Sequence, residues 1–151
     1  MKYTSVESTT EEEEVMMTPK ERLLLLADKL EADANNPKGI KFDLYQWFGD
    51  ETREMICNGG VPILDCGTVG CAIGLAMLTP EFNKEGFGTS KFQTPEFNKK
   101  VQWDAVEEYF GLSHRKALKL FYDLEYPRNL RKGADAEHAV TKRIREHTAT
   151  M

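Results

Sequence analysis

Apolar and small residues occupy every face of a helix between Thr68 and Leu78, which is the most distinctive hydrophobic pattern in the chain. A helix without a polar face belongs at the centre of a core, and small residues let neighbouring helices approach closely. The pattern therefore predicts a buried central helix that is capped by Thr68 and places Ala72, Ile73 and Ala76 in the core.

Four further segments carry apolar residues at helical spacing. The first runs from Pro19 to about Ala34, where Thr18 and Glu21 form a capping box. The others are residues 101–110, residues 113–124 and a last helix that Asp135 would cap. No run has the alternation of a convincing strand. The sequence thus predicts a mainly α fold, a compact single-domain bundle of about five helices around the central one.

A hexapeptide that begins at Thr79-Pro80 recurs at Thr94-Pro95. In both copies the threonine can cap a helix and the proline suits its first turn, so both copies predict helix starts. Two short copies do not make a repeat architecture. Coincidence or a local duplication explains them best, and a shared role in ligand binding stays open.

The chain divides at Thr18. Residues 1–17 are rich in Ser, Thr and Glu and include the run Glu11–Glu14, so they predict a disordered acidic tail. Residues 18–148 predict one helical globular domain, since a chain of 151 residues suits a single domain.

The net charge of −5 comes largely from that acidic tail. Nucleic-acid binding needs a clustered basic face. The basic residues between Arg128 and Arg145 are better explained as solvated helix and loop charges. We therefore expect a protein partner rather than a nucleic acid, and self-association is compatible with the sequence.

The chain lacks an apolar run near the roughly 20 residues that a membrane span needs, and its polar start does not resemble a signal peptide. Three cysteines, an odd number, point to free thiols in a reducing cytoplasm. Zinc-module spacings and glycine-rich phosphate loops are missing from the sequence, so we expect no metal and no cofactor.

Several motifs follow one another along the chain, in the order Phe42-Asp43-x-x-x-Trp47, Cys66-Gly67-Thr68-x-x-Cys71-Ala72-x-Gly74-x-Ala76, Phe110-Gly111-Leu112-Ser113 and Leu120-Phe121. From Thr18 onward this order resembles a family of small, mostly uncharacterised proteins of bacteria and tailed phages. Gly70 stands where that family often has Ala, and Leu75 where it often has Trp or His. The resemblance implies a fold, an intracellular location (the host cytoplasm for a phage protein) and a phage source, and it implies no activity.

Cys66 is the candidate nucleophile, because free backbone N–H groups at the following helix start would lower its pKa and serve as oxyanion donors. The base would have to be His114 or His138, which we expect on exposed helix faces. In the structural alternative, Cys66 packs in its turn and Cys71 fills the core. The sequence favours this structural alternative. We therefore expect no catalytic residues.

The aromatic residues offer a different lead. Trp47 and Tyr126 are candidate ligand-binding residues if either lies exposed beside Arg128 and Arg131, where it could stack on a nucleotide while the arginines pair with its phosphates. Most other aromatic side chains are expected in the core.

Three functions are compatible with these observations. The leading interpretation is a non-enzymatic intracellular interaction module, compatible with a phage origin, that binds a host or virion protein. The alternatives are a binder of a small anionic ligand such as a nucleotide, and a cysteine-dependent hydrolase or transferase that uses Cys66.

Overall fold

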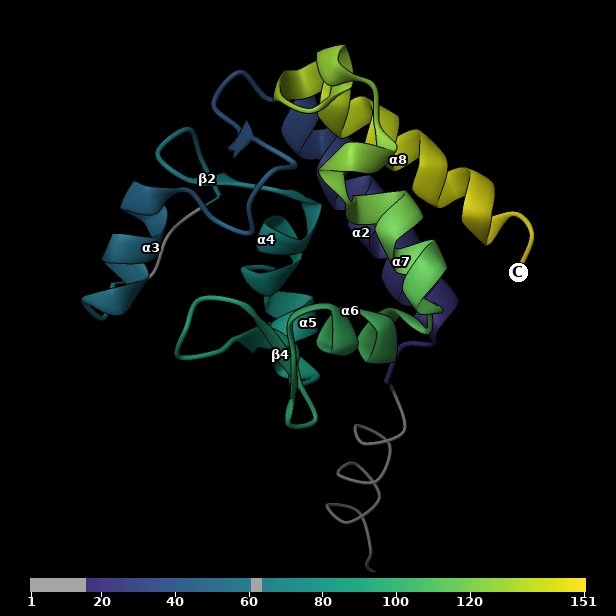
Figure 1. Ribbon diagram of the computed structural model, residues 1–151, viewed down its shortest axis with the longest axis horizontal. Helices are drawn as coiled ribbons and strands as arrows, with labels where there is room; N and C mark the ends of the chain where they lie inside the picture. The colour runs from purple at the N-terminus through teal and green to yellow at the C-terminus, as the bar shows by residue number, and fades with distance from the viewer. Residues whose placement is uncertain (1–15, 61–63) are drawn as a thin grey trace, which may run out of the picture.

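The computed structural model describes residues 16–60 and 64–151 (Figure 1). These residues form a mainly α structure, as predicted, with more helices than expected. The seven α-helices are α2 (Pro19–Ala34), α3 (Asp50–Cys57), α4 (Ala72–Met77), α5 (Pro80–Lys84), α6 (Gln102–Phe110), α7 (His114–Phe121) and α8 (Gly133–Thr148). Two 3-10 turns, η1 (Asp123–Glu125) and η2 (Arg128–Leu130), connect α7 to α8. The predicted tail, residues 1–17, lies almost entirely outside the described residues.

Helices α2 and α8 lie side by side and antiparallel (Figure 1). Arg145 of α8 pairs with Asp28 at 2.9 Å and with Glu31 at 2.8 Å on α2. The predicted capping box is present, because Thr18 and Glu21 each accept the backbone N–H of the other. The inward face of α2 consists of fully buried apolar residues, namely Leu23, Leu26, Ala27 and Leu30. The predicted bounds and face of this helix are therefore confirmed.

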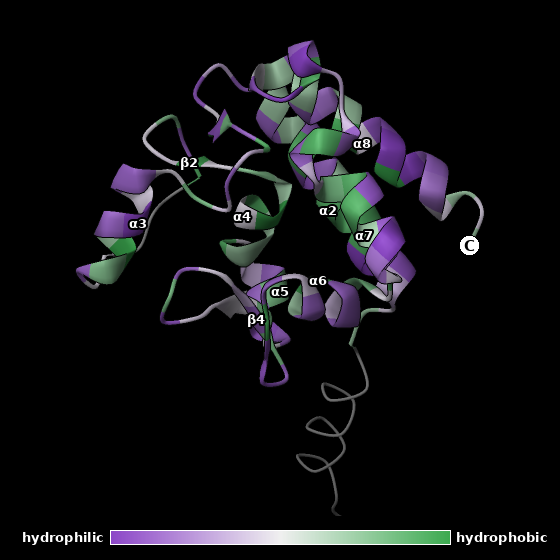
Figure 2. Cartoon of the chain, in the orientation of Figure 1, coloured by the Kyte–Doolittle hydropathy of each residue, from purple (hydrophilic) through white to green (hydrophobic). Residues whose placement is uncertain are grey.

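The central helix is buried as predicted, but it is shorter. Every residue of α4 is buried, and Ala72, Ile73 and Ala76 are fully inaccessible to solvent. Figure 2 shows α4 in pale and green tones between outer helices with purple surfaces. The prediction that Thr68 caps this helix is wrong, because the next two residues form a strand and the helix begins after Cys71.

Short strands, which the sequence did not predict, connect the loops. Strand β1 (Lys41–Phe42) pairs in parallel with β2 (Val69–Gly70). Strands β3 (Gly88–Thr89), β4 (Pro95–Phe97) and β5 (Lys100–Val101) form an antiparallel sheet. Strands of two or three residues are too short to show the alternation by which a sequence reveals a strand.

The two copies of the hexapeptide adopt different structures. Pro80 begins α5 as predicted, although the Thr79 hydroxyl donates to the Leu75 carbonyl at 2.8 Å instead of capping the helix. Pro95 lies in β4, so the predicted second helix start is wrong. Pairing of β4 with strands on both sides outweighs the local helix signal there.

The boundaries of the last two helices also differ from the sequence prediction. Helix α7 begins at its Ser113 cap but ends at Phe121, where the chain turns into η1 and leaves Leu124 exposed. Helix α8 begins at Gly133, whose φ of 86° is left-handed. Asp135 therefore lies in the first turn of α8 and does not cap it.

A close backbone contact fixes the loop before α3 against the central helix. A Cβ atom at Gly70 would lie 2.7 Å from the carbonyl oxygen of Trp47, and a Cβ atom at Gly74 would overlap that oxygen. The Cys71 N–H donates to the same oxygen at 3.4 Å. Only glycine allows this approach at either position, so the two glycines set where Trp47 lies.

A buried polar cluster joins α2 to the end of α5 and to α6. The Glu85 carboxylate accepts hydrogen bonds from the Tyr109 hydroxyl at 2.7 Å, from Arg22 Nε at 2.9 Å and from the Met17 N–H at 2.7 Å. Although burial favours the neutral acid, these bonds and the charge of Arg22 hold the pKa of Glu85 below its ordinary value. The buried charges of Arg22 and Glu85 are therefore paired with each other.

A second buried pair lies between α2 and α8. Burial, and next the hydrogen bond and the charge of Asp33, raise the pKa of Glu137 to about 10. Asp33 Oδ2 and Glu137 Oε2 find no N–H or hydroxyl donor among the described residues. A proton held between the two carboxyl groups satisfies both oxygens.

Replacement of Gly74 by Ala tests the close backbone contact. Gly74→Ala should lower the free energy of unfolding by roughly 1–3 kcal/mol, because the Trp47 carbonyl must move away from the new Cβ atom. Chemical denaturation measures this change. Gly88→Ala is the matched control, since a Cβ atom at Gly88 has only an ordinary contact at 3.7 Å with Asn83. Equal stability of the two variants would contradict the account of the contact.

The buried carboxyl pair predicts a pH dependence of stability. The folded chain keeps the Glu137 proton between about pH 4.5 and about pH 10, where the unfolded chain has released it. Stability should therefore fall as pH rises across this window, by at most about 1.4 kcal/mol per pH unit. Thermal melts between pH 6 and 9 should show a flatter profile for Glu137→Gln. The exposed residue Glu146 provides the control, and Glu146→Gln should keep the wild-type slope. An unchanged slope in Glu137→Gln would exclude this pair as the cause.

Candidate binding cleft

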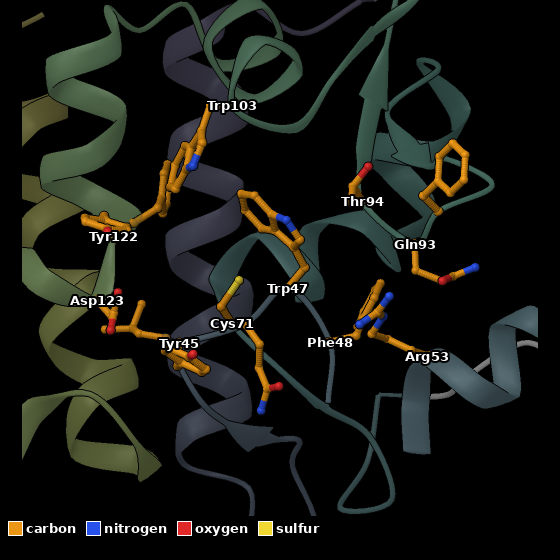
Figure 3. Close-up of a pocket in the computed structure, with 14 residues that line it drawn as sticks. Tyr45, Trp47, Phe48, Arg53, Cys71, Gln93, Thr94, Trp103, Tyr122 and Asp123 are labelled. Carbon is orange, nitrogen blue, oxygen red and sulfur yellow. The ribbon is translucent and has the colours of Figure 1, made fainter. Parts of the chain in front are cut away.

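Aromatic side chains line a cavity of about 500 Å³. It lies between the loop before α3, the turn from β3 to β4, and the facing ends of α6 and α7 (Figure 3). We call it the aromatic cleft, after five of its lining residues, namely Tyr45, Trp47, Phe92, Trp103 and Tyr122.

Two tryptophans form the centre of the cleft. The ring centroids of Trp47 and Trp103 are 5.0 Å apart with an interplanar angle of 58°. Tyr122 continues the row, edge to face with Trp103 at 6.2 Å. Figure 3 shows these rings facing a common space. Aromatic pairs at such distances are mutually attractive, so the wall of the cleft is preorganised.

The rim of the cleft exposes large aromatic side chains to solvent. Tyr45 is 76% exposed and Phe92 is 68% exposed. Single exposed apolar residues are ordinary, whereas exposed aromatic residues that line the same hollow make it a candidate binding surface.

The turn from β3 to β4 presents Phe92 through a strained backbone. Gln93 has a left-handed φ of 61° although it is not glycine. The Ser90 hydroxyl oxygen accepts the N–H groups of Phe92 and Thr94, and the Gln93 N–H donates to the Ser90 carbonyl. These hydrogen bonds maintain the strained backbone of the turn.

Cys71 forms part of the cleft floor. Its thiol is buried and points toward Trp47 in Figure 3. Burial raises the pKa of Cys71 to about 11, against the opposing effect of nearby backbone N–H groups. The thiol is therefore protonated at neutral pH and is a poor nucleophile.

A second cavity, of about 580 Å³, continues from the aromatic cleft. Both cavities are lined by Tyr45, Gln46 and Asp123. Three cations also line the second cavity, namely Arg128, Arg131 and Lys132. We therefore call this cavity the basic pocket. A single surface thus combines aromatic and basic side chains.

The candidate ligand-binding residues divide between these two cavities and the core. Trp47 lines the aromatic cleft, and Arg128 and Arg131 line the basic pocket. Tyr126 lies in the core, where its hydroxyl donates to the Leu120 carbonyl at 2.6 Å and Arg143 covers its ring at 3.8 Å. It cannot stack on a ligand in this arrangement.

Sequence reasoning did not single out Tyr45, Phe92, Trp103 or Tyr122 as site residues. Tyr45 and Phe92 lie in short loops, where no periodicity distinguishes an exposed aromatic residue from a buried one. Among the sequence features, the Thr-Pro repeat came nearest to indicating this site, because its second threonine, Thr94, lines the cleft.

Cys66 is exposed, so the expectation that it packs in its turn is wrong. Asp65 Oδ1 accepts the Gly67 N–H at 2.9 Å, and this tight turn holds Cys66 outward. The segment that carries Cys66 precedes β2, on the opposite side of Figure 1 from α7 and α8, which carry His114 and His138. The structure does not bring these candidate catalytic residues together.

The two candidate histidines have other surroundings. His114 Nδ1 lies 2.6 Å from Glu107 Oε2 at the surface. His138 is exposed on α8, beside Glu31 and Arg145. Within residues 16–60 and 64–151, no three His, Cys, Asp or Glu side chains are grouped as they would be around a metal ion.

Comparison with protein-family models, with curated proteins and with solved structures finds no match to the chain. Within the described ranges, every helix is too short or too polar to cross a bilayer.

Thiol alkylation tests the placement of the cysteines. In the native protein, iodoacetamide at pH 8 should label Cys57 and Cys66 quickly, because both are exposed, and Cys71 only after denaturation. Mass spectrometry of the digested protein measures each rate. His114→Ala and His138→Ala should leave the Cys66 rate unchanged. A lower labelling rate of Cys66 in either variant would favour the cysteine-dependent enzyme instead.

Proposed function

We propose that this chain is a non-enzymatic interaction module that binds a segment of a partner protein in the aromatic cleft. The observation that carries the proposal is the set of solvent-exposed aromatic rings around a preformed hollow, with Trp47 and Trp103 at its centre. Tryptophan and tyrosine are enriched among the residues that dominate protein–protein binding energy. A cavity of about 500 Å³ accommodates a few side chains of such a segment.

The chemistry of the cleft supports binding rather than catalysis. Its one cysteine, Cys71, is protonated because burial raises its pKa to about 11. None of the three histidines of the chain lines the cavity, so no general base of that type faces the thiol.

A cytoplasmic location, a phage source and a host or virion partner also belong to this proposal. Their support is the sequence resemblance and the odd number of cysteines, which favours free thiols. The alternative of a small anionic ligand is supported by the basic pocket, which adjoins the cleft.

The proposal can be tested by selecting peptides from a random twelve-residue library on the full chain. Both tryptophans of the chain lie in the cleft, so intrinsic tryptophan fluorescence reports directly on its occupancy. Selected peptides should change this fluorescence, and the double variant Tyr45→Ala/Phe92→Ala should bind them at least about tenfold more weakly.

Leu24→Ala is the control, because Leu24 is also exposed and apolar but lies on α2 and does not line the cleft. This variant should keep the wild-type affinity. Failure to select any peptide, or equal binding by the double variant, would overturn the proposal.

A further inference from the structure

The cations of the basic pocket have no anionic partner within the described residues. Arg128 and Lys132 are exposed and form no ion pair, and Arg131 uses only its Nε atom, on the Tyr126 carbonyl at 2.9 Å. Guanidinium groups bind carboxylates by donating two parallel hydrogen bonds. The unpaired guanidinium N–H groups of Arg128 and Arg131 can therefore bind a carboxylate.

Two carboxylates, Asp43 and Asp123, line the basic pocket together with its three cations, so a net positive charge remains. Both carboxylate oxygens of Asp43 accept hydrogen bonds from its own loop. Oδ1 accepts the Tyr45 N–H at 3.0 Å, and Oδ2 accepts an N–H of Gln46 Nε2 at 3.0 Å. Asp123 is the one other carboxylate that lines the pocket. Asp43 thereby positions Tyr45 and Gln46 at the boundary between the two cavities.

The charge around the cleft is opposite in sign to that of the chain. The whole chain has a net charge of −5. Arg53 lies at the far end of the cleft beside Phe48 (Figure 3), and with it four cations face two carboxylates along the two cavities. Local complementarity of this kind selects the charge of a partner more than it sets raw affinity.

From this arrangement we infer that the bound partner segment is acidic: an apolar or aromatic side chain occupies the aromatic cleft, and an adjacent aspartate or glutamate occupies the basic pocket. The inference rests on the proposed function and specifies its partner. The shape of the cleft favours a peptide over a nucleotide. Trp47 and Trp103 are tilted by 58° and do not form the parallel faces between which a flat base would lie.

The library selection is repeated with Arg128→Gln/Lys132→Gln, which removes two exposed cations. Peptides selected on the wild-type chain should combine an apolar anchor with neighbouring Asp or Glu. Peptides selected on the variant should keep the anchor and carry fewer acidic residues. For one wild-type peptide, replacing its acidic residues by their amides should weaken binding at least about tenfold, and the variant, which keeps Arg131, should show a clearly smaller loss.

Lys20→Gln/Lys38→Gln removes the same charge from exposed residues outside both cavities, and it should select the same acidic peptides as the wild type. Apolar anchors without acidic neighbours would overturn this inference and leave the proposed function standing. Selection of no peptide would remove both. Displacement of a bound acidic peptide by ATP at equal concentration would overturn the inference in favour of the small anionic ligand.

Discussion

The structure depends on one close contact, in which the carbonyl oxygen of Trp47 lies against the backbone at Gly70 and Gly74. A Cβ atom at either glycine would lie closer to that oxygen than an ordinary contact allows. The contact brings the loop before α3 onto the buried helix α4, and the Cys71 N–H donates to the same oxygen. The spacing of the two glycines is therefore a requirement of packing, and it fixes the residue that forms the centre of the cleft.

The rest of the core supplies a rigid base for this contact. On one side, the α2–α8 pair buries apolar faces and closes around the Asp33–Glu137 carboxyl pair. On the other side, Glu85 joins α2 to α6 through charged hydrogen bonds. Because Trp103 is carried by α6, this scaffold holds one tryptophan while the glycines hold the other. A preformed cleft loses little freedom when a ligand binds, which favours affinity.

The sequence predicted those features that depend on local signals. The Thr18 cap and the leucine spacing located α2, and the apolarity of residues 72–77 on all sides indicated burial of α4. The sequence could not predict β4, because Thr94-Pro95 has the local pattern of a helix start and only the pairing with β3 and β5 makes it a strand. The same limit applied to the site: whether Tyr126 or Trp47 is open to solvent depends on contacts between distant segments, and only Trp47 lines a cleft.

The most direct test of this account is the distance between the two indole rings when the glycine contact is disturbed. Nuclear Overhauser contacts between Trp47 and Trp103 should be strong in the wild-type chain, whose ring centroids are 5.0 Å apart. In Gly70→Ala they should weaken or vanish, while the stacked core pair Phe87 and Tyr109, 4.7 Å apart, keeps its contacts. An unchanged Trp47–Trp103 contact in a folded Gly70→Ala variant would contradict the claim that the glycines position the cleft.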